Sequence, residues 1–262
     1  IIKSFELLNE NGIICYVLPK TFLNCLYYNN TRKFIYKNYE IIDIINCDQY
    51  DFIETKQETV LFIIKKNKLE RNIEKNDDYT FINYDYHIFN TSENIKKLKN
   101  IWKNEHTTLK ELHFDVKIGN IVWNQVKDIL TNDPTKTRLI YCSDINNNNK
   151  IEFKKYKNIF KKNFIEKDGN NTTTIIINRG YGKSKYKFNY TLLDVDYDYL
   201  IENHLMYLKH TDKNIKKKKL DTLLNKILSS FQNQLTIDFI DIYFGNNSIN
   251  KMELMYMFPI FI

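Results

Sequence analysis

The sequence of 262 residues contains no alanine, and only four of its 39 basic residues are arginine. It also lacks a first methionine, and an apolar pattern begins directly at Ile1 and Ile2. Isoleucine, asparagine, lysine and tyrosine are abundant instead, which is typical of AT-rich coding sequences. We therefore expect a piece of a longer protein, and we attribute part of its composition to the genome.

Long apolar runs are absent as well. No stretch approaches the roughly 20 apolar residues of a membrane helix, and the first residues lack the parts of a secretory signal. The sequence therefore predicts a soluble protein without a membrane partner, in the cytoplasm of its cell or of a host cell. With 43% apolar and 15% aromatic residues, it has enough material for a large core.

Cysteine and histidine are few and show no metal-ligand spacing. The four cysteines form no C-x-x-C pair, and the three early ones lie in or beside apolar runs, so we expect buried thiols. The five histidines form no H-E-x-x-H motif. The sequence therefore predicts no metal site.

The net charge of +7 is unevenly distributed. Residues 1–70 hold nine basic and nine acidic residues, so the remainder carries 30 − 23 = +7. A basic region rich in aromatic residues suits a nucleic-acid partner, because cations neutralise phosphates and rings stack on bases. Lysines that reflect only AT-rich codons on a solvated surface are the alternative.

The first seventy residues read as alternating helices and strands. Residues 13–18, 41–45 and 59–64 are short, continuous apolar runs, and residues 21–38 suit a crossover helix. Such runs predict a largely parallel α/β sheet covered on both faces. Three strands are too few for such a sheet, so we expect its missing part before residue 1.

The later residues have a different, more irregular pattern. Residues 67–80 are polar, so we predict a first domain over 1–70, a linker over 71–80 and a second domain over 81–262. The second domain is expected to be mixed α/β, of the α+β kind. The predicted elements are strands at 118–123, 138–142 and 173–177, a helix at 220–231, a helix or strand at 237–244 and an apolar tail at 252–262.

One segment resembles a known family. Asn11-Gly12, Val17-Leu18-Pro19 and Phe22-Leu23, followed by Arg32 and the strand at 41–45, resemble the N6-adenine DNA methyltransferases of restriction–modification systems. The resemblance is to the part that follows their catalytic Asn-Pro-Pro-Tyr motif. It implies that residues 1–70 are the C-terminal portion of a Rossmann-like methyltransferase sheet.

The same resemblance suggests one catalytic residue. The family's next block pairs an aromatic residue with a strand, and Phe52 before the strand at 59–64 has that position. Its ring would stack on the adenine once that base leaves the duplex. The alternative is that Phe52 is a core residue that precedes a strand.

The resemblance also implies S-adenosylmethionine as cofactor. The family's glycine-containing cofactor loop, its acidic residue after the second strand and Asn-Pro-Pro-Tyr do not occur in this sequence. We therefore expect no cofactor-binding residue in this fragment, with the cofactor held mainly by a preceding part. The chain alone is expected to be inactive in methyl transfer.

The second domain resembles the target-recognition domains of these enzymes and the specificity subunits of type I restriction systems. The matching pieces, in order, are residues 119–127, 138–141, 179–182 and 201–205 and the helix at 220–231. This resemblance implies double-stranded DNA as partner. It also makes a restriction endonuclease a candidate partner.

Two loops and one corner supply the candidate DNA-binding residues. Amides can pair bidentately with adenine, lysine reaches guanine or phosphate, and glycines let a backbone approach its partner closely. The candidates are Trp123, Asn124, Gln125, Lys127, Arg179, Tyr181, Lys183, Lys185 and His204. A core position for Trp123, a plain β-turn at 179–185 and a structural corner at His204 remain alternatives.

Three functions are consistent with these features. The first is a fragment of an enzyme that transfers a methyl group to N6 of a flipped adenine, without a metal or a covalent intermediate. The second is a DNA-binding specificity subunit whose catalytic partner is a separate chain. The third is a bifunctional polypeptide with a nuclease further upstream.

Overall fold

The computed structural model describes residues 1–47, 58–66, 76–179, 187–244 and 248–261. By internal contacts the chain forms two compact units. The first comprises Ile1–Glu105 and Ile237–Asn247, and the second comprises His106–Gly180, Lys187–Thr236 and Ser248–Ile262. The first unit thus extends past the predicted linker at 71–80. Units defined by contacts are not functional domains, so the assignment of catalysis and DNA recognition to parts of the chain stays a prediction.

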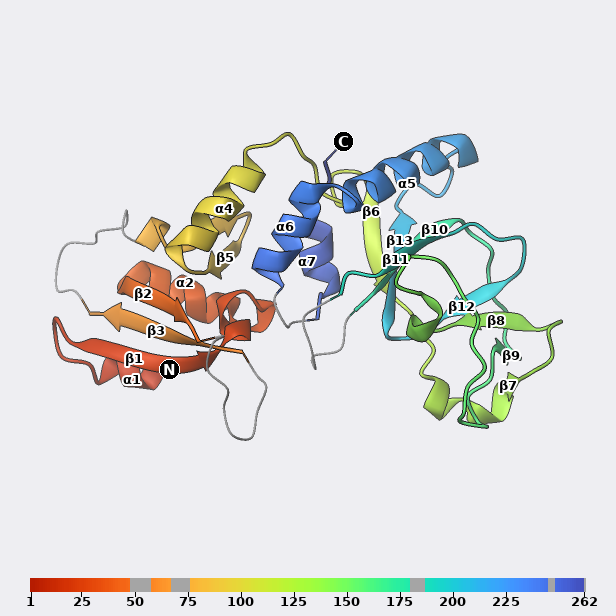
Figure 1. Cartoon of the computed structure of the whole chain (residues 1–262), viewed down its shortest axis with the longest axis horizontal. Coiled ribbons are helices and arrows are strands. Elements are labelled where there is room, and N and C mark those ends of the chain that lie inside the picture. The colour runs from red at the N-terminus through yellow and green to blue at the C-terminus, as the bar shows by residue number, and fades with distance from the viewer. Residues whose placement is uncertain (48–57, 67–75, 180–186, 245–247, 262) are drawn as a thin grey trace. The chain divides into compact units, whose positions relative to one another are not determined.

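The first unit contains three sheet strands, a hairpin and several helices (Figure 1). Its elements are α1 (Ile2–Glu6), β1 (Ile13–Pro19), η1 (Lys20–Leu23), η2 (Leu26–Tyr28), α2 (Asn29–Asn38), β2 (Glu40–Asn46), β3 (Thr59–Lys65), β4 (Thr80–Asn83), β5 (Tyr86–Phe89) and α4 (Ser92–Trp102). The strands predicted at 13–18, 41–45 and 59–64 are confirmed. The helix predicted over 21–38 is a true α-helix only in its second half.

The prediction of a largely parallel sheet was wrong for these strands. The order is β1-β3-β2, and β3 pairs antiparallel with both neighbours. The apolar run of β1 does not mark a strand buried on both faces, because Ile13 and Val17 are 59% and 58% exposed. The abundance of isoleucine lengthened the run and concealed the alternation of an ordinary antiparallel strand.

A buried arginine organises the core of the first unit. Phe5, Phe22, Ile35, Phe62 and Phe89 belong to its hydrophobic cluster. Arg32, on α2, has no exposed surface. Its guanidinium donates to the carbonyl oxygens of Phe22 at 2.8 Å, Cys25 at 2.9 Å, Asn24 at 3.3 Å and His87 at 2.5 Å. One side chain thus joins η1 and η2 to the β4–β5 hairpin.

The second unit contains two four-stranded sheets. Its strands are β6 (Phe114–Ile118), β7 (Leu130–Thr131), β8 (Thr137–Ile140), β9 (Phe164–Ile165), β10 (Thr174–Asn178), β11 (Tyr190–Leu193), β12 (Tyr199–Ile201) and β13 (Leu205–His210). The sheet β11-β10-β13-β6 is antiparallel throughout. In β12-β8-β9-β7, the β12–β8 pair is parallel and the others are antiparallel.

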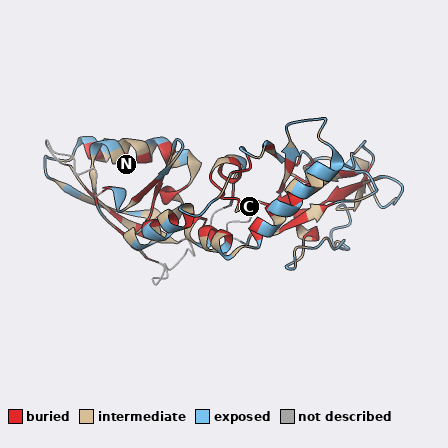
Figure 2. Ribbon diagram, turned by 90° about the horizontal axis from the view of Figure 1, so that it is seen from above, coloured by how far each residue is buried: buried red, intermediate tan, exposed pale blue. Residues whose placement is uncertain are grey.

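Helices complete the chain. They are the short η3 (Trp123–Gln125), η4 (Lys127–Ile129) and η5 (Cys142–Asp144), and α5 (Lys217–Phe231), α6 (Gln234–Tyr243) and α7 (Lys251–Tyr256). The strand at 173–177 and the helix at 220–231 are confirmed, and 237–244 is mostly helical. The strand predicted at 118–123 was wrong, because β6 ends at Ile118 and Trp123 starts a 3-10 turn. Buried residues follow the strands of each unit (Figure 2).

Candidate nucleic-acid interface

Three of the sequence pieces predicted to recognise DNA are neighbours in the second unit. Residues 199–201 pair in parallel with 138–140. Ile121 forms a parallel bridge with Glu202, and the Asn203 N–H donates to the Ile121 carbonyl at 2.9 Å. The pieces 119–127, 138–141 and 201–205 therefore meet at the edge of one sheet.

Gly119 permits this close approach. A Cβ atom at this position would lie 2.2 Å from the Glu202 carbonyl oxygen and 2.4 Å from that of Ile201. Real Cβ atoms essentially never show such distances, so any larger residue must push the two segments apart. The glycine is required by packing rather than by a turn.

The turns η3 and η4 present the predicted polar residues beside a core residue. Trp123 is half-buried and packs against the cluster that includes Leu139 and Tyr141. Asn124, Gln125 and Lys127 are exposed. The Lys127 Nζ lies 5.9 Å from the centre of the Trp123 ring. The two turns therefore expose two amides and one cation, and the Trp123 indole packs against the core.

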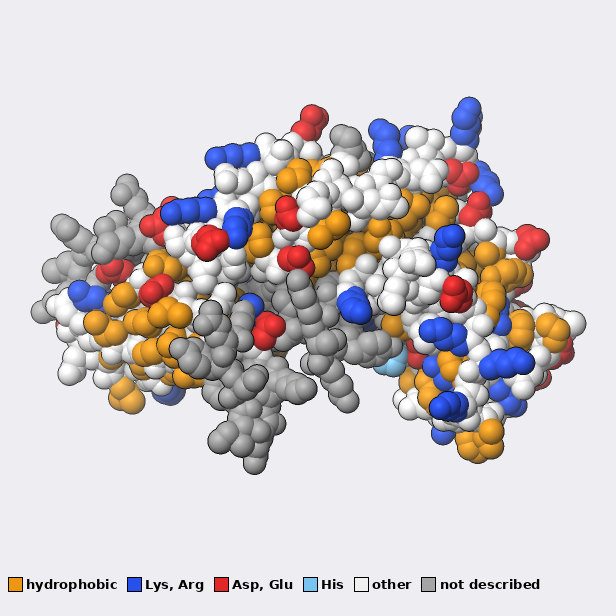
Figure 3. Space-filling view, viewed as in Figure 1, with side chains coloured by type: hydrophobic (Ala, Val, Ile, Leu, Met, Phe, Trp, Pro, Cys, Tyr) orange, Lys and Arg blue, Asp and Glu red, His pale blue; other side chains and the backbone are white. Residues whose placement is uncertain are grey.

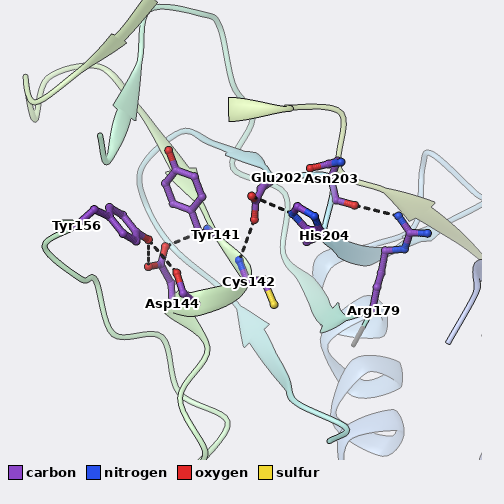
Figure 4. A network of polar contacts seen from close by, with 9 residues as sticks. Tyr141, Cys142, Asp144, Tyr156, Arg179, Glu202, Asn203 and His204 are labelled. Carbon is purple, nitrogen blue, oxygen red and sulfur yellow. Dashed lines mark hydrogen bonds and ion pairs between the residues drawn. The ribbon is translucent and has the colours of Figure 1, made fainter. Parts of the chain in front are cut away.

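Arg179 and His204 meet at the corner formed by residues 202–204 (Figure 4). The Arg179 N–H donates to the His204 carbonyl at 3.1 Å, and its guanidinium Nη1 donates to the Asn203 carbonyl at 3.2 Å. The His204 Nδ1 lies 3.0 Å from the Glu202 carboxylate, and its ring is 47% exposed. Arg179 thus holds the corner, while the His204 side chain stays about half exposed.

Two buried carboxylates support this edge from inside (Figure 4). Glu202, which is 3% exposed, accepts the Cys142 N–H at 3.3 Å. Asp144 is fully buried and accepts the Tyr141 N–H at 3.0 Å and the Tyr156 O–H at 2.8 Å. The backbone at 141–142 is therefore held by one carboxylate on each side.

Burial is the largest influence on the pKa values of Asp144, Tyr141 and Tyr156. It raises the pKa of Asp144, although bonds from Tyr141 and Tyr156 and the charges of Arg138 and Lys161 act in the opposite direction. It also raises the pKa of Tyr156 and of Tyr141, so both hydroxyls keep their protons at neutral pH. Tyr156 is therefore a hydrogen-bond donor to Asp144.

Asp144→Asn is predicted to change how stability depends on pH. Because the folded pKa is raised, the folded chain binds a proton at Asp144 more readily than the unfolded chain does. Protonation of Asp144 thus contributes to the free energy of unfolding of the wild type below about pH 4, the ordinary aspartate pKa. This contribution is lost as the pH rises from there through the raised pKa. Asparagine cannot titrate, so the variant should gain stability relative to wild type over that window.

The measurement is urea unfolding of both proteins across that pH range. Exposed Asp168→Asn provides the matched control. A difference between wild type and Asp144→Asn that stays constant with pH, or that moves in the opposite direction, would contradict the prediction.

The exposed side chains of this region can form hydrogen bonds and ion pairs with a partner. Among the described residues, no three His, Cys, Asp or Glu side chains are grouped so that they could hold a metal ion. The polar network links backbone segments and ends at the His204 imidazole, and the exposed amides of Asn124 and Gln125 and the Lys127 cation belong to η3 and η4 of the same unit. Such groups match the phosphates and base edges of DNA.

Sequence reasoning missed the buried half of this network. Asp144 and Tyr156 are twelve residues apart, on either side of the polar loop 146–149, and no local pattern connects them. Glu202 lies within a piece singled out by resemblance, but its role as acceptor for Cys142 depends on a partner 60 positions away. Only the folded chain brings these groups together.

Four predicted site residues lie outside the described residues. They are Phe52, Tyr181, Lys183 and Lys185. Their roles, like the contacts of Trp123, Asn124, Gln125, Lys127, Arg179 and His204 with DNA, stay predictions.

Comparisons with known proteins agree with the resemblance noted in the sequence. Residues 1–53 match the family described as Eco57I restriction-modification methylase. The chain is 24% identical over 259 residues to the type II methyltransferase M.CvrRI of Paramecium bursaria Chlorella virus XZ-6E. That alignment covers 93% of this chain and 59% of the relative. The predicted resemblance to restriction–modification methyltransferases is confirmed.

The type IIG restriction endonuclease BpuSI aligns with 99% of this chain and 41% of its own, at 12% identity and a TM-score of 0.33. A TM-score of this size does not establish a shared fold.

The described helices include none that is long and apolar enough to cross a membrane.

Proposed function

We propose that this chain is part of a site-specific DNA methyltransferase that acts on N6 of adenine. Residues 1–70 contribute to the catalytic domain, and residues 81–262 read the DNA sequence. The match of residues 1–53 to a restriction-modification methylase family carries the proposal. The alignment with a type II methyltransferase over nearly the whole chain supports it.

In this proposal S-adenosylmethionine supplies the methyl group when bound. The residues present do not fit its site, because the sequence has no glycine between Gly12 and Gly119 and the first strand of the unit begins after Gly12. None of the strands β1 to β5 of the first unit is therefore followed by a glycine-containing loop. We assign no residue of this chain to the cofactor, and we predict that the chain alone does not methylate DNA.

The chain's own contribution is to bind and orient DNA. Asn124, Gln125 and Lys127 project from η3 and η4, and His204 from the corner that Arg179 holds. Amides and an imidazole read base edges, and the cation contacts phosphate or guanine. Phe52 would accept the face of the flipped adenine, which has lost its stacking neighbours.

DNA binding by the purified chain tests the proposal. Phosphate contacts release counterions, so six or more contacts lower affinity by about 10³-fold or more between about 50 and 200 mM salt. Fluorescence anisotropy with a labelled duplex measures this dependence. Absence of binding, or an affinity that does not change with salt, would refute a DNA-reading role.

Phe52→Ala in the full-length enzyme is predicted to lower methylation by about 10- to 100-fold, because base–aromatic stacking contributes about 1–3 kcal/mol. Affinity for duplex DNA should change little, since the ring meets only a flipped base. Phe52→Trp keeps a stacking surface and should retain most of the activity. Equal methylation by wild type and Phe52→Ala would remove the catalytic assignment.

The gene context separates one polypeptide from two. An Asn-Pro-Pro-Tyr motif and a glycine loop encoded upstream in the same reading frame would place catalysis and recognition on one chain. The same motifs in a separate gene would favour a specificity subunit. Paired acidic residues and a lysine of a nuclease core still further upstream would indicate a bifunctional enzyme.

A further inference from the structure

Residues 150–167 concentrate positive charge in the second unit. The lysines are Lys150, Lys154, Lys155, Lys157, Lys161, Lys162 and Lys167, against Glu152 and Glu166. The segment therefore carries 7 − 2 = +5, compared with +7 for the whole chain. Its only regular element is β9, so nearly all of it is an extended loop.

Backbone pairing holds the two ends of this loop, at Ile151 and at β9, and side chains hold the part between them. Tyr156 donates to the buried Asp144 at 2.8 Å. The Lys161 Nζ lies 4.1 Å from the ring centre of Tyr141 and 4.2 Å from that of Tyr156.

A cation between two rings makes a second anchor for the loop. The buried guanidinium of Arg138 lies 3.4 Å from the ring centre of Phe153 and 4.9 Å from that of Phe164. With the contacts of Tyr156 and Lys161, the inner side of the loop is attached to β8 and η5.

The outer side of the loop combines free cations with exposed apolar side chains. Lys154, Lys155 and Lys157 are exposed, and none of them forms an ion pair within the part of the chain that the structure describes. Ile159 and Phe160 are 77% and 55% exposed.

A local turn presents this apolar pair. The Asn158 side chain accepts the Phe160 N–H at 3.0 Å, and the Asn158 carbonyl accepts the Lys161 N–H at 3.0 Å. The turn therefore projects Ile159 and Phe160 from a fixed backbone.

This surface continues into the predicted recognition residues. The Lys127 Nζ lies 5.6 Å from the ring centre of Phe160 and 5.9 Å from that of Trp123. Lysine and arginine side chains alternate with hydrophobic ones over β7, β8 and β9 in the face drawn in Figure 3. The loop and η3–η4 thus form one surface.

The combination of exposed lysines and exposed apolar side chains indicates the class of partner. The core of a protein–protein interface is depleted in lysine, so a lysine-rich loop does not fit one. Large apolar side chains also occur singly on ordinary protein surfaces, but Ile159 and Phe160 are adjacent and lie beside a cluster of cations. Proteins that bind DNA use both, with lysines on phosphates and apolar side chains against thymine methyl groups or base steps.

We propose that residues 153–162 form a DNA-docking loop. Lys154, Lys155 and Lys157 contact phosphates of the duplex, and Ile159 and Phe160 enter the adjacent groove beside Lys127. The inference rests on the proposed DNA-reading function and extends its binding surface by a loop whose residues were not chosen by resemblance.

The charge arm of the test replaces Lys154, Lys155 and Lys157 by glutamine in the complete chain. The matched control replaces Lys213, Lys216 and Lys218, which are also exposed, so that the net charge changes by the same amount. Binding to a labelled duplex is measured across salt concentrations. In the docking-loop variant the slope of log affinity against log salt concentration should become shallower by about 0.9 per lost phosphate contact, or about 2.7 for three. The variant should bind about 100-fold more weakly.

The control should stay close to wild type. Equal losses in the two triple variants would show a general charge effect and overturn the proposal, as would an unchanged docking-loop variant. If wild type itself fails to bind, the proposed function fails instead. Acetylation of lysines in wild type gives an independent readout, because DNA should protect 154, 155 and 157 but not 213, 216 and 218.

The apolar arm keeps every lysine and replaces Ile159 and Phe160 by serine. Affinity should fall about 10-fold while the salt slope stays that of wild type, because no phosphate contact is removed. Circular dichroism should show an unchanged fold, since both side chains are exposed. Unchanged affinity would overturn the groove contact.

Discussion

Arg32→Ala is expected to lower the free energy of unfolding of the first unit by about 3–5 kcal/mol. The Arg32 guanidinium is fully buried and donates to the carbonyl oxygens of Phe22 in η1, of Cys25 just before η2 and of His87 in the β4–β5 hairpin. A hydrogen bond to a charged group contributes about 1.5–3 kcal/mol, and alanine removes several at once and leaves a cavity. Since domains are stable by only about 5–15 kcal/mol, much of that margin would be lost.

Urea unfolding followed by circular dichroism measures this loss. Lys37→Ala is the matched control, because Lys37 is an exposed basic residue on the same helix, and it should stay within about 0.5 kcal/mol of wild type. Arg32→Lys retains the charge but not the planar set of donors, so it should fall between the two. An unchanged unfolding midpoint for Arg32→Ala would show that the buried guanidinium is not needed for stability.

Gly119→Ala is expected to cost about 3 kcal/mol in the second unit and to weaken DNA binding. The added Cβ would lie 2.2 Å from a backbone oxygen of Glu202, which cannot move like the end of a side chain. Separation of the two segments lengthens the hydrogen bond from Asn203 to Ile121 and adds to the cost of overpacking, about 1–3 kcal/mol. The corner that carries His204 would then be displaced from η3.

Two measurements separate the local effect from general unfolding. Amide hydrogen exchange should accelerate most at Asn203, whose N–H bonds to Ile121. Asn120→Ala is the control, because Asn120 is adjacent and exposed, and it should leave exchange and affinity unchanged. Unaltered exchange at Asn203 in Gly119→Ala would contradict the proposed close packing.

The motifs found by resemblance differ in how much of their role the sequence could predict. Arg32 was recognisable as an arginine after the proline-containing segment, yet one of its four carbonyl acceptors, His87, lies on a hairpin 55 residues away. Gly119 occurs in a predicted recognition piece, but nothing in that piece shows that residues 201–202 lie against it. The docking loop has no apolar periodicity, so only its lysine-rich composition could be read from the sequence.

Local signals determined a definite part of this protein from the sequence alone. Strands at 13–18, 41–45, 59–64 and 173–177 and the helix at 220–231 were predictable because apolar runs and helical spacing involve neighbouring residues. The likeness to restriction–modification methyltransferases was likewise readable, because its motif is contiguous.

Tertiary structure alone decided the pairing and the site. The antiparallel order β1-β3-β2, the bridge from Ile121 to Glu202 and the bond from Tyr156 to Asp144 join segments whose separation in sequence carries no signal. Pairing direction depends on which strand edges meet when the chain collapses, and burial of a carboxylate depends on which side chains surround it. Neither property is encoded within one segment, so each required the folded chain.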